Sequence, residues 1–281
     1  MESNSKKENG KLSTQSYWEK SQESNFKNIY SKQEASEVQA HWWRMDAGSY
    51  TKYLVDKFYE KYLPRGNNLS FIEVGAAPGR NMIIMHNKFG YIPFGVEYTE
   101  IGYEQIKKML AENNLPTDNA IHADFLDPSF SPKYIDCFDV VASFGFLEHF
   151  DNPKEVVEKH LNILKSGGYL FIIIPNFRYI NYLLRCFFNT NFIETHNLEL
   201  MDLNTFRNCF VFDNFQIEEC CYLGSFMFPQ PTHTSPSKRY VEKVLGKLQI
   251  VLNALSYNIF GTNAPESKYF SQSLVCVGKK I

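Results

Sequence analysis

The most informative stretch of this sequence is Phe71-Ile-Glu-Val-Gly-Ala-Ala-Pro-Gly79, an apolar strand that runs into a Gly-rich turn. Small residues in such a turn let the backbone approach a ligand closely. The helix that follows offers unpaired N–H groups and a positive dipole end to an anionic group. Alone, the stretch indicates a nucleotide-like ligand at the start of a helix, because the same turn binds nucleotides of several kinds.

Outward from this turn, short apolar runs alternate with helical stretches. Continuous apolar strands that alternate with helices predict an α/β fold whose parallel sheet is covered on both faces. The predicted strands are 69–74, 93–98, 120–122, 138–143, 169–175, 215–223 and 271–278. The predicted helices are 80–89, 100–113, 153–164, 179–188, 203–210 and 240–255.

The N-terminal part is predicted to cap this core. The first 15 or so residues, called the lead-in below, are polar and are predicted to be disordered. Ser31-Lys-Gln-Glu34 is a capping box, so a helix is expected between it and His41-Trp-Trp43. A second amphipathic helix follows, with an apolar face of Tyr50, Leu54, Phe58 and Tyr62. We therefore divide the chain into a lead-in and helical cap (1–63), a Rossmann-like core that carries the Gly-rich turn (64–177) and C-terminal helices with the last strands (178–281).

Composition excludes several classes of protein. The 281 residues carry a net charge of −2, and residues 64–177 hold 9 basic and 14 acidic side chains, which argues against a DNA-binding protein. Apolar runs are far shorter than the roughly 18 residues that span a bilayer. The polar start shows no secretory signal, and six Cys lack the spacing of a metal site. We expect a reduced, cytoplasmic protein.

Two acidic residues stand at the carboxyl ends of predicted strands, where a ligand would bind. Glu97 ends the second strand 18 residues after Gly79, where a carboxylate can accept both hydroxyls of a ribose. Asp124 ends the third strand, and Asp139 begins the fourth. The ends of parallel strands meet at one edge of a sheet, so Glu97 and Asp124 are expected to share one site there.

With these residues in place, the chain resembles the class I S-adenosylmethionine-dependent methyltransferases. The resemblance covers about residues 69–177 in the family's order and spacing, and bacterial small-molecule and surface-glycan methyltransferases look closest. It rests on Glu73-x-Gly75-x-Ala77-x-Gly79, Glu97, Asp124-Phe125, the run from Asp139 to Phe150, and Leu164-Lys-Ser-Gly-Gly-Tyr-Leu170 leading into Ile174-Pro-Asn176.

The resemblance implies a Rossmann-like, doubly wound, mostly parallel seven-stranded sheet with a helical N-terminal cap and C-terminal accessory insertions. It also implies S-adenosylmethionine as cofactor. Glu97 would hold the ribose, Tyr98 would flank the adenine, and Ala77 stands where the family usually has Gly. The cofactor-binding residues that it implies are Glu73, Gly75, Ala76, Ala77 and Gly79 at the turn, Glu97, Tyr98, Asp124 and Phe125 at the adenosine, and Ser143 and Phe144 beside the sulfonium.

Other interpretations of the turn fit less well. A dinucleotide-binding enzyme needs G-x-G-x-x-G, which Gly75-x-Ala-x-Gly79 does not match. The sequence Gly-Ala-Ala-Pro-Gly, found here at 75–79, also occurs in RNA 2′-O-methyltransferases. No basic flank accompanies it here, so an RNA 2′-O-methyltransferase is a weaker alternative. The signature of DNA amino-group methyltransferases is absent from the fourth strand. A cofactor-binding partner subunit without turnover also stays open.

Two histidines are candidate general bases. A hydroxyl acceptor must lose a proton, and an imidazole with an ordinary pKa of about 6.5 suits that task. His149 follows the fourth strand, and His196 lies after the fifth; each could equally make a structural hydrogen bond. Glu148 with His149 could form half of a metal site, but no second Glu/His pair at helical spacing appears, so no metal is expected.

Residues outside the cofactor motifs are expected to shape the acceptor pocket. The substrate-binding candidates are Trp42, Trp43, Glu148, Asn176 and Tyr179. The amphipathic helix 240–255 more often packs on its own domain, but contact with a membrane surface or a partner stays open, as does a homodimer. The predicted function is transfer of a methyl group to an oxygen or nitrogen of a small metabolite or activated sugar, in biosynthesis.

Overall fold

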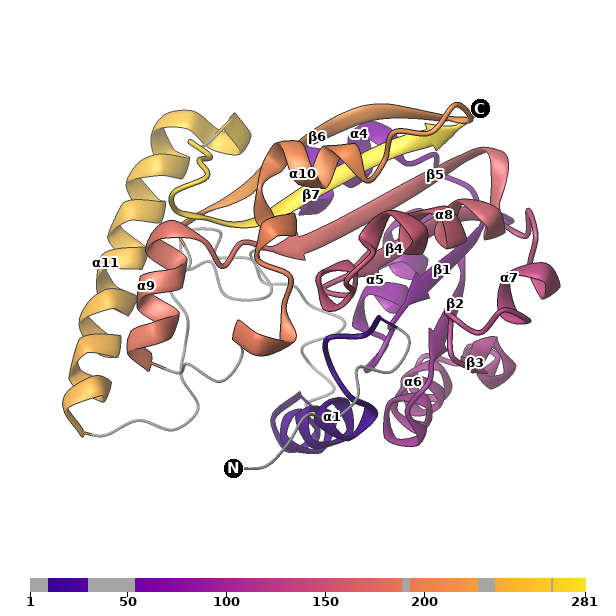
Figure 1. Ribbon diagram of the computed structural model, residues 1–281, viewed down its shortest axis with the longest axis horizontal. Coiled ribbons are helices and arrows are strands. Elements are labelled where there is room, and N and C mark those ends of the chain that lie inside the picture. Colours follow the sequence, from indigo (N-terminus) through magenta and orange to yellow (C-terminus); the bar gives the residue numbers. More distant parts are fainter. Residues whose placement is uncertain (1–9, 30–53, 189–192, 227–235, 264) are drawn as a thin grey trace.

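A single seven-stranded sheet forms the centre of the molecule (Figure 1). The computed structural model describes residues 10–29, 54–188, 193–226, 236–263 and 265–281. The strands are β1 (Ser70–Val74), β2 (Ile92–Glu97), β3 (Ala120–His122), β4 (Phe138–Phe144), β5 (Leu164–Pro175), β6 (Phe215–Phe226) and β7 (Ser271–Lys280). Their order is β3-β2-β1-β4-β5-β7-β6. Neighbours from β3 to β5 are parallel, whereas β7 is antiparallel to both β5 and β6.

Both faces of the sheet are buried, which explains the continuous apolar runs of its strands. Phe71, Val140 and Phe171 point into one core, and Ile72 and Val141 point into the other. Helices α5 and α6 cover the first face, and α8 and α10 cover the second. This arrangement confirms the predicted Rossmann-like, mostly parallel fold.

The helices cover the sheet and surround its carboxyl edge. The α-helices are α1 (Gln15–Ile29), α4 (Glu60–Tyr62), α5 (Arg80–Phe89), α6 (Glu100–Glu112), α7 (Phe130–Lys133), α8 (Pro153–Ile163), α9 (Tyr179–Phe188), α10 (Leu203–Asn208) and α11 (Pro236–Phe260). A π-helical turn, η1 (Val55–Tyr59), precedes α4. The 3₁₀ turns are η2 (Thr117–Asn119), η3 (Leu147–His149), η4 (Ile193–Thr195), η5 (Glu199–Met201) and η6 (Gly261–Asn263). Among the described helices, none combines the length and apolar character that a membrane span requires.

The N-terminal prediction needs one correction. Residues from Gly10 onward were expected to be disordered, but they are paired with the core: Leu12 N–H donates to the His149 carbonyl at 2.8 Å, and Asp151 N–H donates to the Gly10 carbonyl at 2.9 Å. These bonds use backbone atoms, so the polar side chains gave no sign of them. Helix α1 follows, beside α6 (Figure 1).

Only part of the predicted helical cap lies within the described residues. The helix expected after Ser31 lies outside the described residues, as do Trp42, Trp43 and Tyr50. The second predicted helix is present from Leu54 as the π-helical turn η1 followed by α4. Leu54 and Phe58 are buried against the sheet, as the amphipathic pattern predicted.

Candidate active site

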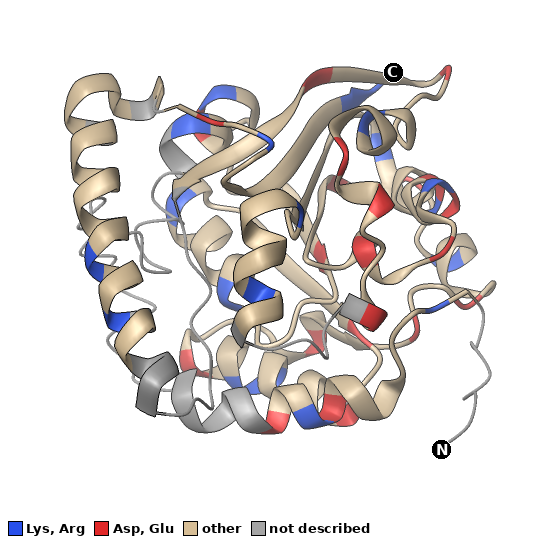
Figure 2. Cartoon of the chain, turned by 60° about the vertical axis from the view of Figure 1, so that its left-hand side comes forward, with Lys and Arg blue, Asp and Glu red and all other residues tan. Residues whose placement is uncertain are grey.

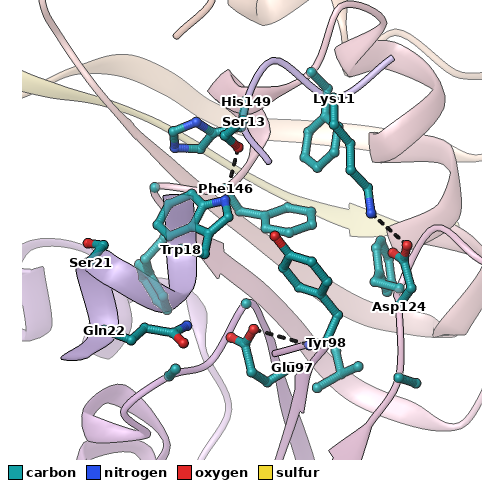
Figure 3. A pocket seen from close by; sticks show the side chains of 18 residues that line it. Lys11, Ser13, Trp18, Ser21, Gln22, Glu97, Tyr98, Asp124, Phe146 and His149 are labelled. Atoms are coloured by element: carbon teal, nitrogen blue, oxygen red, sulfur yellow. Dashed lines mark hydrogen bonds and ion pairs between the residues drawn. The ribbon is translucent and has the colours of Figure 1, made fainter. Parts of the chain in front are cut away.

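A cavity of about 900 Å³, counted with its open mouth, lies at the carboxyl ends of β1 to β4 (Figure 3). The ends of the strands and the residues just after them contribute Gly75, Glu97, Asp124 and Phe144 to its wall. The other lining residues are Lys11, Ser13, Trp18, Ser21, Gln22, Ala77, Val96, Tyr98, Ala123, Phe125, Gly145, Phe146, His149 and Phe150. The position agrees with the general rule that open α/β sheets bind ligands at this edge.

Glycine at position 75 is required by both conformation and space. Gly75 has a φ of +70°, a region that other residues rarely adopt. A Cβ added there would lie 2.9 Å from the ring of Phe146. The bare backbone therefore allows the turn after β1 to approach Phe146 at the cavity wall.

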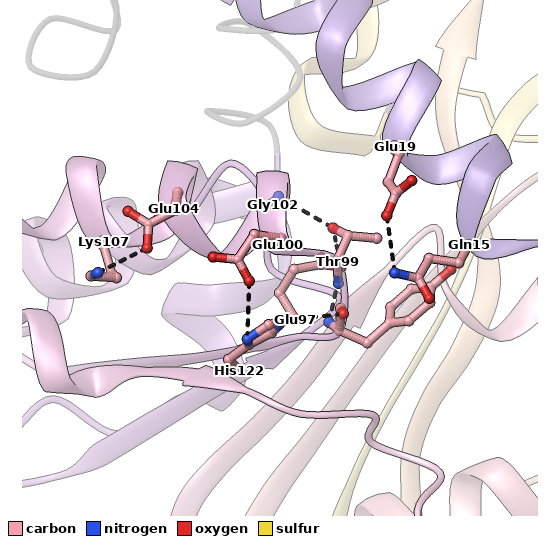
Figure 4. A network of polar contacts seen from close by, with 10 residues as sticks. Gln15, Glu19, Glu97, Thr99, Glu100, Gly102, Glu104, Lys107 and His122 are labelled. Atoms are coloured by element: carbon pink, nitrogen blue, oxygen red, sulfur yellow. Dashed lines mark hydrogen bonds and ion pairs between the residues drawn. The ribbon is translucent and has the colours of Figure 1, made fainter.

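Glu97 is a buried carboxylate held by the start of the next helix (Figure 4). Its Oε1 accepts the backbone N–H groups of Tyr98 and Thr99, each at 3.1 Å, and lies 3.0 Å from the Thr99 hydroxyl. Thr99 also caps α6, since its Oγ1 accepts the N–H of Gly102. These bonds fix the carboxylate at the cavity wall, where it can accept hydrogen bonds from a ligand.

Asp124 connects the cavity to the N-terminal segment. Its Oδ1 accepts the N–H of Leu126 at 3.0 Å, and its Oδ2 lies 2.6 Å from Nζ of Lys11. The same Lys11 Nζ lies 4.8 Å from the centre of the Tyr98 ring. Burial, followed by the charges of Glu97 and Asp124, raises the pKa of Tyr98, so this phenol stays protonated at neutral pH.

The predicted cofactor residues divide into those that line the cavity and those that lie behind it. Gly75, Ala77, Glu97, Tyr98, Asp124, Phe125 and Phe144 form part of the lining, whereas Glu73, Ala76, Gly79 and Ser143 do not. Glu73 is buried; its Oε1 accepts from Asn81 Nδ2 at 2.8 Å, and burial raises its pKa to about 8. We assign Glu73 to support of the Gly-rich turn, because its carboxyl faces α5.

Sequence reasoning missed the contribution of the N-terminal segment. Lys11 and Ser13, together with Trp18, Ser21 and Gln22 of α1, line the cavity opposite the strand ends (Figure 3). Trp18 donates to the Ser13 hydroxyl at 2.9 Å and packs edge-on against His149. One feature of the sequence could have predicted helix α1: Thr14, directly before it, is a typical N-cap residue. In the structure its hydroxyl accepts the Tyr17 N–H at 3.3 Å.

The two candidate bases lie together. The rings of His149 and His196 have centroids 4.4 Å apart, and Oε1 of Glu148 lies 3.6 Å from Nε2 of His149. Burial raises the pKa of Glu148 to about 8, and burial followed by the charge of His196 lowers the pKa of His149 to about 3. Both groups are therefore neutral at neutral pH, and His149 on its own is a weak base.

The remaining substrate candidates have different surroundings. Asn176 is buried, and its Nδ2 donates to the carbonyls of Ser271 and Lys268 at 2.8 and 3.1 Å, so its amide supports the start of β7. Tyr179 lines a second, open hollow with Phe177, Arg178, Tyr182, Leu198, Glu199, Asp202 and Thr205. Phe177 separates this hollow from the histidines, because its ring contacts His196 edge-on at 4.9 Å.

Known proteins share both the sequence pattern and the fold. A family model described as "Methyltransferase domain" matches residues 47–220. The ubiquinone biosynthesis O-methyltransferase, mitochondrial, of Candida albicans is 35% identical over 68 residues. That match covers 24% of this chain and about a fifth (19%) of the length of this curated relative.

Two solved structures are similar in fold at low sequence identity. The MccD protein has a TM-score of 0.52 and 14% identity, over 82% of this chain and 97% of that one. Geranyl diphosphate C-methyltransferase from Streptomyces coelicolor has a TM-score of 0.52 and 11% identity, over 89% and 86% of the two chains. The chain therefore belongs to the methyltransferase-domain family, and its predicted cofactor, S-adenosylmethionine, is the methyl donor of that family.

Proposed function

We propose that this protein transfers a methyl group from S-adenosylmethionine to an oxygen or nitrogen of a small molecule, such as a metabolite or an activated sugar. One observation carries the proposal: Glu97 and Asp124, at successive strand ends, line one cavity, and the buried His149 lines the same cavity. We infer that the adenosine binds against these carboxylates and that the acceptor lies beside His149, which lines the same cavity.

The cavity fits the cofactor in its chemistry. The buried carboxylate of Glu97 suits the ribose hydroxyls, and the aromatic rings of Tyr98 and Phe125 suit a flat base. The bare backbone at Gly75 leaves room beside Phe146 for the amino-acid end. When bound, S-adenosylmethionine supplies a methyl group on a sulfonium, whose S–CH₃ bond breaks with both electrons left on sulfur.

The protein must orient the acceptor and, for a hydroxyl, accept its proton. His149, which lines the cavity, and His196 beside it are suited to these two tasks. His149 is neutral, and its Nδ1 donates to the Thr195 carbonyl, so its Nε2 can accept a hydrogen bond from the acceptor. His196, which is only partly buried, is the better placed of the two predicted bases to receive the proton and pass it to solvent.

The walls of the cavity favour a small acceptor. Trp18 and Gln22 of α1 line the cavity, and Gln22 Oε1 accepts from the hydroxyl of Thr99 beside Glu97, so the N-terminal segment narrows the cavity (Figure 3). Ser13 is buried beneath Trp18. A polymer such as RNA would have to displace this segment, whereas a small molecule can enter beside it.

Calorimetry with S-adenosylmethionine and S-adenosylhomocysteine tests the cofactor, with Glu97→Ala as the site variant. Glu100→Gln is the control, since Glu100 lies at the same strand end but is exposed. The acceptor is then sought by transfer of a labelled methyl group to sets of phenols, sugars and amines. Failure of the unaltered protein to bind either ligand at high micromolar concentration would overturn the proposal.

A further inference from the structure

Three side chains of metal-binding type meet beside the cavity. Glu148 and His149 belong to η3, and His196 follows η4. One ligand atom from each lies within 4.8 Å of the other two. No second Glu/His pair at helical spacing is present in the sequence, but the fold brings His196 to His149 from 47 positions along the chain.

A single residue orients both imidazoles. His149 Nδ1 donates to the Thr195 carbonyl at 2.7 Å, and His196 Nδ1 lies 3.0 Å from the Thr195 hydroxyl. A histidine that binds a metal usually engages its other nitrogen in this way, which fixes the tautomer and the direction of the ligating nitrogen. The bond from Nδ1 leaves the lone pair of His149 on Nε2, the atom that lies 3.6 Å from Glu148.

Glu148 supplies an independent sign of a ligand. The residue is 1% exposed, and its Oε2 has no hydrogen-bond partner among the described residues. A buried carboxyl oxygen without a partner is unfavourable unless it is paired or coordinates a metal. The two neighbouring imidazoles can share a cation with it but cannot both donate to it.

We propose that Glu148, His149 and His196 bind one divalent cation of the Mn²⁺, Co²⁺ or Zn²⁺ type. Two imidazole nitrogens and one carboxylate oxygen suit these ions better than Mg²⁺ or Ca²⁺, which prefer oxygen ligands. Three protein ligands leave coordination positions open, as in catalytic metal sites.

This site deepens the proposed function and rests on it. His149 lines the cavity, so an acceptor oxygen there could complete the coordination. With a cation bound, His149 and His196 act as its ligands, and the base role proposed above for His196 passes to the cation. The cation lowers the pKa of a bound hydroxyl, whose proton then leaves to solvent. The O–CH₃ bond forms as the S–CH₃ bond of the donor breaks, and the sulfur keeps the electron pair.

The test is metal binding by the full chain, first stripped with chelator and studied without cofactor. Zn²⁺ is titrated by calorimetry, and Co²⁺ by its visible absorption, which distinguishes nitrogen and oxygen ligands from thiolate. The variants are Glu148→Gln and His196→Asn. The matched control is His86→Asn, because His86 is also partly buried with its Nδ1 at a backbone carbonyl, that of Tyr91.

We expect one ion per chain, and binding at least about tenfold weaker in both cluster variants but unchanged in His86→Asn. Equal uptake by the cluster variants, no uptake, or a thiolate absorption band would overturn the proposal. Binding of S-adenosylhomocysteine, measured separately, keeps the two proposals apart: its loss would refute the methyltransferase function, whereas metal binding reports only on the cluster.

A second inference rests on α11, which buries a polar stripe and exposes an apolar one. Its inward side carries Gln249, Asn253 and Ser256, all buried. Its outward side carries five apolar residues that are each 45–67% exposed: Val244, Leu248, Val251, Leu255 and Ile259. Both sets recur at three- and four-residue spacing, so each forms one stripe. An ordinary surface helix has the opposite arrangement.

Charge indicates what covers the apolar stripe. Lys243 and Lys247 are exposed beside it, and Figure 2 shows the described length of α11 in tan and blue, without red. The sequence of α11 has four basic residues and one acidic residue. An apolar stripe flanked by Lys is typical of helices that lie in the interface of an anionic membrane.

We propose that α11 binds the protein to the surface of anionic lipid bilayers. The test is co-sedimentation with phosphatidylcholine vesicles, with and without phosphatidylglycerol. The variants are Leu248→Gln with Leu255→Gln, and Lys243→Gln with Lys247→Gln. Ile135→Gln is the control, because Ile135 is an exposed apolar residue outside α11.

We expect binding to the anionic vesicles only, at least tenfold weaker in the Leu variant, several-fold weaker in the Lys variant and unchanged in Ile135→Gln. Absence of vesicle binding would overturn the proposal. So would light scattering that shows a dimer which the Leu variant separates, because a second copy would then cover the stripe.

Discussion

Lys11 and Asp124 form an ion pair of 2.6 Å across 113 positions of the chain. With the backbone bonds of Gly10 and Leu12, this pair holds the N-terminal segment against the end of the sheet. Helix α1 begins immediately afterwards and lines the cavity with Trp18. We therefore expect cofactor exchange to depend on how easily this segment separates from the core.

Lys11→Met should speed the release of S-adenosylhomocysteine. The pair is partly exposed, so its loss is worth about 1 kcal/mol or less, which corresponds to a severalfold weaker affinity at most. Stopped-flow displacement measures the dissociation rate. Lys20→Met, an exposed change of the same charge on α1, is the control. An unchanged rate in Lys11→Met would show that the segment does not limit release.

Glu97→Ala should weaken cofactor binding by about 1.5–3 kcal/mol, the scale of hydrogen bonds to a charged group. The carboxylate is buried and fixed by the N–H groups of Tyr98 and Thr99, so no neighbour can replace it. Calorimetry with S-adenosylhomocysteine gives the value, and far-ultraviolet circular dichroism checks the fold. An affinity equal to that of Glu100→Gln would contradict a ribose contact.

Gly75→Ala should reduce both stability and cofactor affinity. The change places a side chain in a left-handed backbone conformation and brings its Cβ to 2.9 Å from Phe146. Gly167→Ala is the matched control, because Gly167 also has a positive φ but no atom within 4 Å of an added Cβ. Strain alone costs about 1–2 kcal/mol, so urea unfolding should show a larger loss for Gly75→Ala. Equal losses would mean that Phe146 moves aside freely.

The sequence predicted the sheet well because each core strand carries its own apolar run. Helix α5 has its predicted bounds, and β3 does as well. The ordered start at Gly10 depends on backbone pairing, which side chains do not reveal. The meeting of His149 and His196 depends on the path of the chain through η4. The periodicity of α11 was predicted, but a periodic pattern cannot say which stripe faces the domain.

A pH-dependent stability should follow from Glu73. Glu73 is 3% exposed, and burial raises the pKa of its carboxyl to about 8, against the lowering effect of hydrogen bonds from the Asn81 side chain and the Met82 backbone. The folded chain keeps this proton up to about pH 8, whereas the unfolded chain loses it near its ordinary pKa of 4.5. Unfolding therefore releases a proton between these values, and the free energy of unfolding falls as pH rises.

Glu73→Gln should make that fall shallower, because the amide cannot ionise. Urea unfolding at pH 5 and pH 8 measures the slope, and each unit of pKa shift corresponds to about 1.4 kcal/mol. Glu148, whose pKa burial also raises to about 8, adds to the fall, whereas His149 and His160, whose pKa values burial lowers to about 3 and about 4, oppose it below about pH 6.5. These contributions are the same in both proteins, so the difference between the two slopes reports on Glu73. Glu104→Gln, a change on the exposed side of α6, should leave the slope unaltered. Equal slopes in Glu73→Gln and the unaltered protein would show that Glu73 is ionised in the folded state.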